Sequence, residues 1–332
     1  MHNCTGSARL LASTHALLGA VLMAGGAACS DSSDGPVEPI DAAVESSVVD
    51  AAVTPEASAD ASGLIDADAD AGKKLGSIGC GKVATSGPVA SMIKVGTLDR
   101  SYILSIPVGY DREKPIPLVF GWHGQSGTAA HFRAGDTPYG GKGGAVETAS
   151  DGKAIFVYPL GTNREGAKTG WQIGEGIDTA LFDALVAKVS GDLCVDPARI
   201  FSFGFSYGAR MSNQLACLRP NVLRGVAPVS GYGPIVPCAA GPVGVWMLNI
   251  QDDPVVPFYH SAPENFSGED TRDFWIKQNG CTTTTTAVTP AGCVAYTGCK
   301  ADAPLTFCAQ ATGGHAFPPV VYDGIWKFIE SF

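Results

Sequence analysis

Residues 199–208 join an apolar run directly to the turn Gly204-Phe205-Ser206-Tyr207-Gly208, and a helical pattern follows. A serine on a sharp strand-to-helix turn lifts its hydroxyl above the edge of a sheet, so this order is typical of a nucleophile in an α/β domain. Glycines at 204 and 208 leave room where strand and helix cross at close range. A plain glycine-rich turn is the alternative, but it does not explain the strand before and the helix after. We therefore predict that Ser206 is a nucleophile.

After residue 90, short β-rich runs alternate with helical stretches. The predicted strands are Ser101–Ile106, Pro117–Gly121, Ala154–Tyr158, Arg199–Phe205, Gly225–Val229, Gly244–Ile250 and Pro304–Phe307. The predicted helices are Thr179–Ser190, Tyr207–Leu218, Glu269–Gln278 and Val320–Ile329. Several strands are almost continuously apolar, as expected when both faces of a sheet are covered. The pattern predicts one α/β domain over 76–332, with a mostly parallel central sheet and helices on both faces.

A serine nucleophile needs a base and an acid, and in this chain order they follow it as acid and then histidine. Only His260 and His315 lie downstream of the turn. His315 lies in a glycine-rich turn between the last predicted strand and helix, where the base belongs, whereas we expect His260 to be an exposed surface residue. The acid should follow the strand that ends at residue 250. Asp252 and Asp253 both stand there, and residue order alone does not choose between them.

An oxyanion hole needs two backbone N–H groups, one of them from the residue after the nucleophile, Tyr207. The other should come from the loop after an earlier strand, and His123-Gly124-Gln125-Ser126 follows such a strand. We assign the amide of Gln125, with that of Ser126 as the alternative. His123 is expected to support this loop rather than to act as a second base.

The N-terminal part of the chain reads as an export segment. Residues 1–28 combine Arg9 with an apolar run that ends in small residues, which is a secretory signal pattern. Cys29 follows directly, as in bacterial lipoproteins, where that cysteine receives the lipid. Residues 29–75, rich in Ala, Ser and Asp, are predicted to form a disordered linker. Export to the cell surface or the medium is expected, with membrane attachment through Cys29 if that residue is lipidated.

The formal net charge of −10 arises in this linker. Residues 30–72 hold eleven acids and no Lys or Arg, and without them and Arg9 the chain has 21 basic and 21 acidic residues. Because nucleic-acid binding needs a basic surface, we expect no nucleic-acid partner. The acidic total gives no support for a cationic partner either.

Ten cysteines fit export, because an even number of them remains once Cys4 and Cys29 are set aside. The other eight are Cys80, Cys194, Cys217, Cys238, Cys281, Cys293, Cys299 and Cys308. In an exported chain they predict disulfides, although sequence does not fix the pairing. The last four are close enough to pair with one another and to fix the loop that carries His315. Ligand spacing typical of zinc is missing, so no metal and no other cofactor is expected.

Several motifs occur together in an order that resembles a known family. They are His123-Gly124, Cys194-Val-Asp-Pro-Ala-Arg-Ile, the Ser206 turn, Leu215-Ala-Cys, Ala227-Pro-Val-Ser-Gly, Asp253-Pro-Val-Val-Pro and Gly313-Gly-His. The set resembles the secreted polyhydroxybutyrate depolymerase and feruloyl/acetylxylan esterase family, carbohydrate esterase family 1, over roughly residues 90–330. The resemblance implies an α/β-hydrolase fold and a Ser–His–Asp ester hydrolase, with Asp253 rather than Asp252 as the acid.

The resemblance favours a feruloyl or acetyl ester of a plant polysaccharide as the substrate, with a polyester such as polyhydroxybutyrate as the alternative. A non-catalytic surface lipoprotein that keeps the fold is a further alternative. The chain departs from the family at Tyr207-Gly208-Ala209, Gln125-Ser126 and Ala316-Phe317, which leaves the substrate open. We expect Trp122, Trp171 and Phe317 to line the substrate pocket, although Trp171 is equally suited to the core. The enzyme is expected to be a monomer.

Overall fold

The computed structural model describes residues 76–136, 141–164, 168–235, 238, 241–261, 266–300 and 302–332. The predicted signal peptide at 1–28, Cys29 and the linker at 29–75 lie outside these ranges and stay predictions. No helix within the described ranges has the length and the apolar character needed to cross a bilayer.

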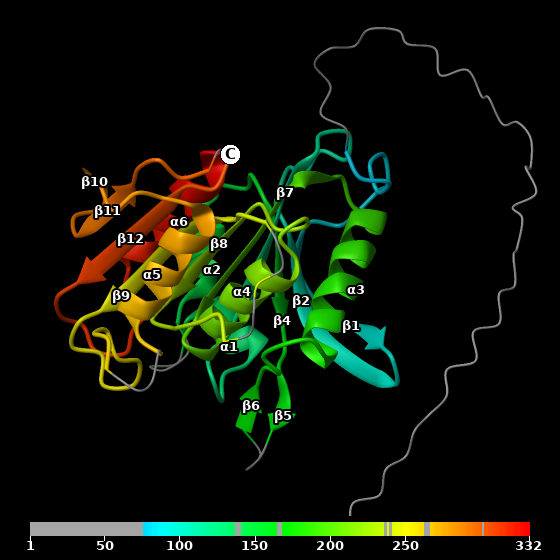
Figure 1. The fold of residues 1–332 in the computed structure, drawn as a ribbon. Helices are drawn as coiled ribbons and strands as arrows, with labels where there is room; N and C mark the ends of the chain where they lie inside the picture. Colours follow the sequence, from blue (N-terminus) through cyan, green and yellow to red (C-terminus); the bar gives the residue numbers. More distant parts are fainter. Residues whose placement is uncertain are drawn as a thin grey trace, which may run out of the picture. The chain divides into compact units, whose positions relative to one another are not determined.

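A ten-stranded mixed sheet forms the centre of the described fold, in the order β1-β2-β4-β3-β7-β8-β9-β12-β11-β10 (Figure 1). Its strands are β1 Gly87–Val95, β2 Leu98–Ile106, β3 Ile116–Trp122, β4 Ile155–Pro159, β7 Val195–Phe205, β8 Gly225–Val229, β9 Gly244–Ile250, β10 Thr285–Val288, β11 Cys293–Tyr296 and β12 Leu305–Gln310. The six strands from β4 to β12 in this order pair in parallel, and the strands outside them pair antiparallel. The carboxyl ends of β7, β9 and β12 therefore meet at one edge.

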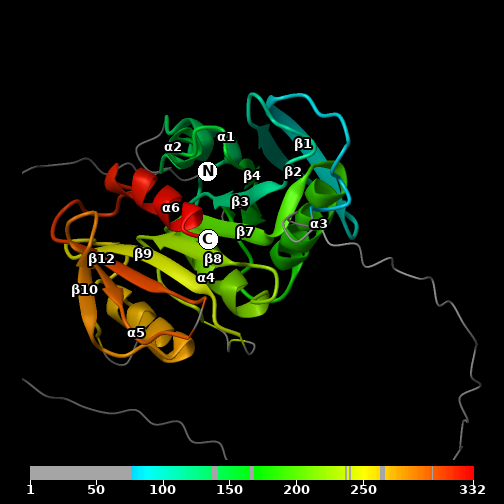
Figure 2. The same cartoon turned by 90° about the horizontal axis from the view of Figure 1, so that it is seen from above.

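Helices cover both faces of this sheet (Figure 2). On one face lie α1 Ala129–Ala134, α2 Gly143–Ala149 and α6 Val320–Glu330, and on the other lie α3 Ile177–Asp192, α4 Tyr207–Leu218 and α5 Gly268–Asn279. Each layer has its own apolar core: Phe132 and Ile325 belong to the first, Phe182 and Trp275 to the second. The predicted two-faced α/β architecture is confirmed.

The buried elements match the prediction best. Both β8 and β9 are buried along their whole length, and their bounds and those of α4 are the predicted ones. The elements that were not predicted are β1, β10 and β11, the short helices α1 and α2, and the small hairpin of β5 Thr162–Arg164 and β6 Lys168–Gly170. Neither β1 nor β10 contains a fully buried residue, so each lacks the apolar run that marks a central strand.

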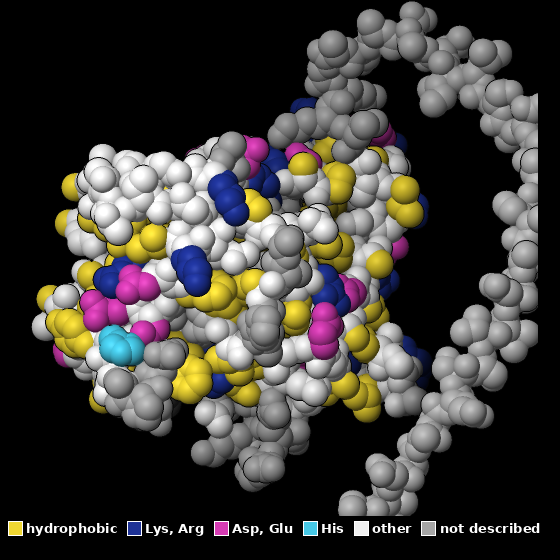
Figure 3. Space-filling view, in the orientation of Figure 1, with side chains coloured by type: hydrophobic (Ala, Val, Ile, Leu, Met, Phe, Trp, Pro, Cys, Tyr) yellow, Lys and Arg dark blue, Asp and Glu magenta, His cyan; other side chains and the backbone are white. Residues whose placement is uncertain are grey.

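Eight cysteines form four disulfides: Cys80–Cys194, Cys217–Cys238, Cys281–Cys299 and Cys293–Cys308. The last four cysteines pair among themselves, as expected. Cys293–Cys308 joins the paired strands β11 and β12, and β12 leads into the His315 loop. On the face drawn in Figure 3, basic and acidic side chains lie interspersed, without a continuous basic surface.

Candidate active site

The predicted strand–turn–helix around Ser206 is present. Strand β7 ends at Phe205, α4 begins at Tyr207, and Ser206 between them has φ 54° and ψ −115°, a conformation that L-residues rarely adopt. A methyl group on Gly208 would lie 2.0 Å from the carbonyl oxygen of Trp122, and one on Gly204 would lie 2.4 Å from the carbonyl carbon of Gly208. Both positions therefore require glycine, for the reason that the sequence suggested.

His315 reaches Ser206 from the loop between β12 and α6. Its Nε2 lies 2.8 Å from Oγ of Ser206, and its side chain is 18 % exposed. The imidazole also packs on the ring of Phe205, with 4.9 Å between the ring centroids. The ring is thus held in place while one side stays open to solvent.

Asp253 contacts the other nitrogen of this ring. Its Oδ2 lies 2.8 Å from Nδ1 of His315, and Oδ1 accepts hydrogen bonds from the amides of Val255 (2.8 Å) and Val256 (2.9 Å). Burial alone would raise the pKa of the Asp253 carboxyl, but the hydrogen bonds from His315 and from the two amides lower that pKa overall. The group is therefore held as a carboxylate that accepts the Nδ1 proton, which leaves Nε2 free to accept one from Ser206.

Asp252 has a different position from its neighbour. Its two carboxylate oxygens accept hydrogen bonds from the amides of Gly313 (3.2 Å) and Gly314 (2.7 Å), in the loop just before His315. On the other side of the histidine, the hydroxyl of buried Ser230 donates to the carbonyl of Ala316 at 2.8 Å. The histidine loop is therefore tied down on both sides, and sequence reasoning identified neither tie.

The His123-Gly124 loop lies beside Ser206. A methyl group on Gly124 would come within 3.5 Å of Cβ of Ser206. The amide of Ser126 donates to the carbonyl of Thr169 at 2.8 Å, so it is not available to a substrate. Among the described residues the amide of Gln125 has no hydrogen-bond acceptor. Of the two predicted donors, the geometry favours Gln125.

His123 is a structural residue, as expected, because it is completely buried beneath this loop. Its Nε2 accepts a hydrogen bond from the amide of Gly161 at 3.0 Å, so its proton resides on Nδ1, 2.7 Å from the carbonyl oxygen of Gly124. Burial lowers the pKa of His123 to about 4, although the bond to Gly124 opposes this shift. His123 is therefore neutral at physiological pH and fixes the carbonyl of Gly124.

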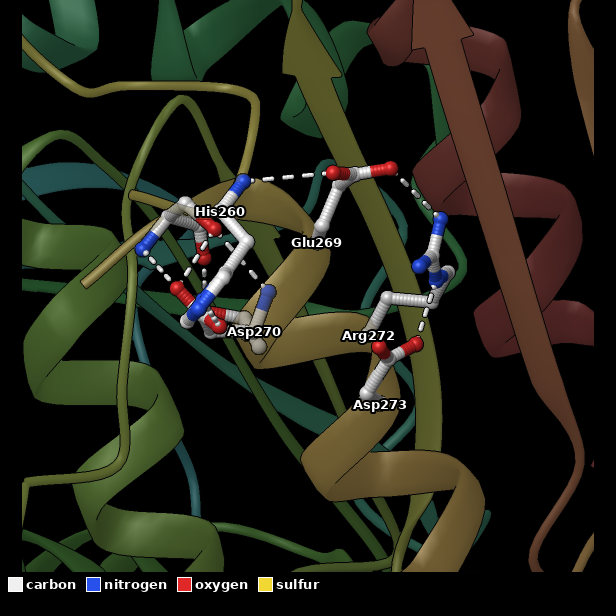
Figure 4. A network of polar contacts seen from close by, with 7 residues as sticks. His260, Glu269, Asp270, Arg272 and Asp273 are labelled. Carbon is white, nitrogen blue, oxygen red and sulfur yellow. Dashed lines mark hydrogen bonds and ion pairs between the residues drawn. The ribbon is translucent and has the colours of Figure 1, made fainter. Parts of the chain in front are cut away.

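As predicted, His260 is an exposed residue, and it contacts Asp270 rather than Ser206. Its side chain is half exposed, and Nδ1 lies 2.5 Å from Oδ1 of Asp270 in the first turn of α5. Figure 4 shows this pair together with the neighbouring contacts of Glu269 and Arg272. Asp270 also bonds Ser267 in a capping box, so this cluster anchors the start of the helix.

The prediction that Trp122 and Trp171 line a pocket is wrong, because both side chains are fully buried. Nε1 of Trp122 donates to Ser202 at 2.9 Å, and Nε1 of Trp171 donates to the carbonyl of His123 at 2.8 Å. Each indole thus meets its hydrogen-bonding need inside the core. Phe317 is also mostly buried, at 8 % exposure, and packs on the rings of Phe132 and Phe205.

Two side chains near the nucleophile escaped the sequence analysis. The guanidinium of Arg210 lies over the rings of Tyr207 and Tyr232, at 5.0 and 4.4 Å from their centroids. The available signal was the spacing of three residues between Tyr207 and Arg210, which places them on the same side of a helix. Tyr232 follows β8 and could be brought to this position only by the parallel pairing of β7 with β8.

The sequence is similar to those of known feruloyl esterases. No protein-family model matches it. The chain is 34 % identical over 266 residues to the probable feruloyl esterase C of Aspergillus terreus, covering 76 % of this chain and 90 % of that protein. It is also 34 % identical over 265 residues to feruloyl esterase C of Emericella nidulans, over 75 % of this chain and 89 % of that one.

A solved structure supports the fold. The acetyl xylan esterase from Aspergillus awamori superposes with a TM-score of 0.56 at 15 % identity, over 73 % of this chain and 99 % of the other. This likeness confirms the α/β-hydrolase architecture. Because a third of the residues are shared with its relatives over most of both chains, the protein belongs to the feruloyl esterase family of serine esterases.

Proposed function

We propose that Ser206, His315 and Asp253 form the catalytic triad of this esterase. The observation that carries the proposal is the unbroken chain from Asp253 Oδ2 to His315 Nδ1 and from His315 Nε2 to Ser206 Oγ, with 2.8 Å at both steps. The three side chains come from loops and a turn at the carboxyl ends of β7, β9 and β12. Such a set is the arrangement that activates a serine hydroxyl at neutral pH.

In the proposed mechanism each of the three residues has a defined step. His315 Nε2 takes the proton of Ser206 as Oγ attacks the ester carbonyl, and Asp253 stabilises the imidazolium that forms. The tetrahedral intermediate collapses when His315 returns the proton to the leaving alcohol. Water then attacks the acyl-enzyme with His315 again as the base, which releases the carboxylic acid and restores Ser206.

The oxyanion is assigned to the amides of Tyr207 and Gln125. The first amide is at the beginning of α4, where the helix dipole favours negative charge. The second is supported by the closeness of Gly124 to Ser206 and by the use of the Ser126 amide elsewhere. Two such donors are worth about 10²–10³ in kcat each in serine hydrolases.

The proposed substrate is a feruloyl or acetyl ester of a plant polysaccharide. Support comes from the relatives, which are named as feruloyl esterases, and from the motif series in the sequence. A non-catalytic role is disfavoured because all three side chains lie in hydrogen-bond contact. Polyester hydrolysis is kept as an outcome of the experiment below.

Export is proposed as well. The pairing of all eight cysteines of the described region into four disulfides supports an oxidising compartment. Lipidation of Cys29 stays a prediction, tested by whether detergent is needed to release the protein from membranes.

A panel of esters tests the proposed function: methyl ferulate, acetylated xylan, polyhydroxybutyrate film and p-nitrophenyl acetate. We expect turnover of the first two and of p-nitrophenyl acetate, and its loss in Ser206→Ala. Full turnover in Ser206→Ala would overturn the mechanism. Turnover of the film alone would move the substrate assignment to polyesters. A folded, oxidised protein that cleaves no ester would favour the non-catalytic role.

A further inference from the structure

The guanidinium of Arg210, on the helix that begins directly after Ser206, lies over two aromatic rings. Its Cζ lies 5.0 Å from the centroid of Tyr207 and 4.4 Å from that of Tyr232. The Tyr232 ring continues to Phe266, with 5.1 Å between centroids, and Phe266 is 44 % exposed. The guanidinium thus belongs to an aromatic surface that begins at the residue following Ser206.

The backbone explains why this side chain is near the reacting serine. The amide of Arg210 donates to the carbonyl of Ser206 at 3.1 Å, so Arg210 lies one turn into α4. Helical side chains lean toward the N-terminus of their helix, which here is the end that carries the nucleophile. A methyl group on Gly231 would lie 2.8 Å from the carbonyl oxygen of Ser206, so the Tyr232 segment packs against the same turn.

The charge of Arg210 has no acidic partner among the residues that the structure describes. Arg133 does pair with Glu147 and Arg219 with Asp183, both at 2.8 Å or less, whereas Arg199 also lacks an ion pair among the described residues. The Nε of Arg210 is buried and finds no hydrogen-bond acceptor. A partly desolvated cation that has no anion among the described residues is unfavourably placed, and the two tyrosine rings offset this only in part.

We propose that Arg210 is a specificity-determining residue that binds a carboxylate of the ester substrate. The inference rests on the proposed function of Ser206. The guanidinium of Arg210 lies over two tyrosine rings, and a carboxylate could accept two parallel hydrogen bonds from its two terminal Nη groups. That carboxylate can come from a uronic acid on the alcohol side of the ester, or from a second carboxyl on the acyl side.

Two pairs of substrates separate these sources. For the alcohol side, an O-acetylated methyl glucuronoside is compared with the O-acetylated methyl glucoside, which differs only in the carboxylate. For the acyl side, monoethyl succinate is compared with ethyl pentanoate. The readout is the ratio of kcat/KM for the anionic ester to kcat/KM for its neutral match, measured by proton release at constant pH.

In the wild-type enzyme we expect this ratio to fall as salt is raised, because screening weakens the ion pair. Arg210→Met keeps much of the stem and removes the charge, and it should lower the ratio by roughly tenfold or more in one of the two pairs. Arg210→Lys should restore part of it, since a lysine keeps the charge without the planar fork.

The matched control is Arg224→Met. Arg224 lies just before β8, at the opposite edge of the sheet, and its guanidinium carbon lies 4.0 Å from the centroid of the Phe332 ring. This substitution should leave the ratio unchanged.

A ratio that does not change in Arg210→Met in either pair would overturn the inference, as would an equal fall in Arg224→Met. If Arg210→Met does not fold, the inference is tested with Arg210→Lys and with the salt dependence of the wild-type ratio. A ratio that does not change with salt would overturn the inference. The proposed function fails separately, when wild type and Ser206→Ala cleave the neutral esters at the same rate. If the wild type cleaves no ester of either pair, the inference falls, while the proposed function is decided by the ester panel and Ser206→Ala.

Discussion

The carboxylate of Asp252 lies 2.7 Å from the amide nitrogen of Gly314, the residue immediately before His315. Its neighbour Asp253 contacts the imidazole of the same histidine. The two consecutive carboxylates after β9 thus hold one loop. Asp252 binds the backbone of that loop, and Asp253 binds the imidazole of His315. This division gives the two residues separable effects on catalysis.

For Asp252→Ala we expect kcat on p-nitrophenyl acetate to fall by about tenfold, because the histidine loop loses two hydrogen bonds and His315 spends less time in reach of Ser206. The chemistry of the pair His315–Asp253 is untouched, so the pH dependence of kcat should keep its midpoint. A shifted midpoint would show that Asp252 acts on the imidazole itself. An unchanged kcat would show that Ser230 and packing are enough to hold the loop.

For Asp253→Asn we expect a much larger loss, of about 10⁴ in kcat. The amide would favour the wrong imidazole tautomer, with the proton on Nε2 facing Ser206. Steady-state rates at several pH values check this, with circular dichroism to verify folding. If Asp253→Asn and Asp252→Ala lost equal activity, the assignment of the acid to Asp253 would be wrong.

The three residues of the proposed triad could be picked out from the sequence because each follows a strand of the central sheet. Such strands carry long apolar runs, so β9 was predicted to the residue and the carboxyl end of β7 was predicted at Phe205, where it lies. The choice between Asp252 and Asp253 needed a likeness to a family, because adjacent side chains in a turn point in different directions that composition does not encode.

The remaining errors concern features that local sequence patterns do not encode. Sequence does not distinguish a tryptophan in a pocket wall from one in a core. Trp171 is accommodated in the core because its indole N–H donates a hydrogen bond to the carbonyl of His123 there. Exposed edge strands such as β1 lack the apolar signal altogether. The contact of Arg210 with Tyr232 depends on strand order, which local sequence does not contain.

The buried imidazole of His123 should make stability depend on pH. Its pKa in the folded state is about 4, against an ordinary value of 6.5. Below pH 6.5 the unfolded chain binds a proton on this residue that the folded chain does not. The contribution of neutral His123 to the free energy of unfolding is therefore fully present above pH 6.5 and is lost as the pH falls toward 4. The shift corresponds to a loss on the order of 3 kcal/mol.

Urea unfolding of the wild type and His123→Gln at pH 7.0, 5.5 and 4.5 measures this loss. Other acidic groups change both proteins alike, so the difference between their free energies of unfolding isolates His123. The advantage of the wild type should shrink as pH falls. A constant difference would mean that the folded protein accepts the proton on His123 without cost.

The disulfide Cys293–Cys308 should stabilise the strands that lead to His315. It closes a loop with a sequence separation of 15 residues, for which the chain-entropy model gives about 3 kcal/mol. We expect the double variant Cys293→Ser, Cys308→Ser to lower the free energy of unfolding by about this amount.

The matched control is removal of the disulfide Cys281–Cys299, which has a sequence separation of 18 and lies before β12 rather than within it. Only the first variant should also lower kcat, and equal losses of kcat would show that the bridge does not act on the histidine loop.

The close approach of α4 to β3 should make Gly208 irreplaceable. In Gly208→Ala the new methyl would lie 2.0 Å from the Trp122 carbonyl oxygen and 2.5 Å from its carbon, and both atoms belong to the rigid backbone of β3. Relief requires the first turn of α4 to move, which displaces Ser206 and costs about 1–3 kcal/mol or more. Gly191→Ala is the matched control, since Gly191 lies in the last turn of α3 and no neighbouring atom lies within 4 Å of the added methyl. There the same change should stabilise the protein by about 1 kcal/mol, because alanine is the better helix former.

Thermal unfolding, with parallel rates on p-nitrophenyl acetate, measures the effect of both substitutions. A Gly208→Ala enzyme with the wild-type rate and melting temperature would contradict the close packing of α4 on β3.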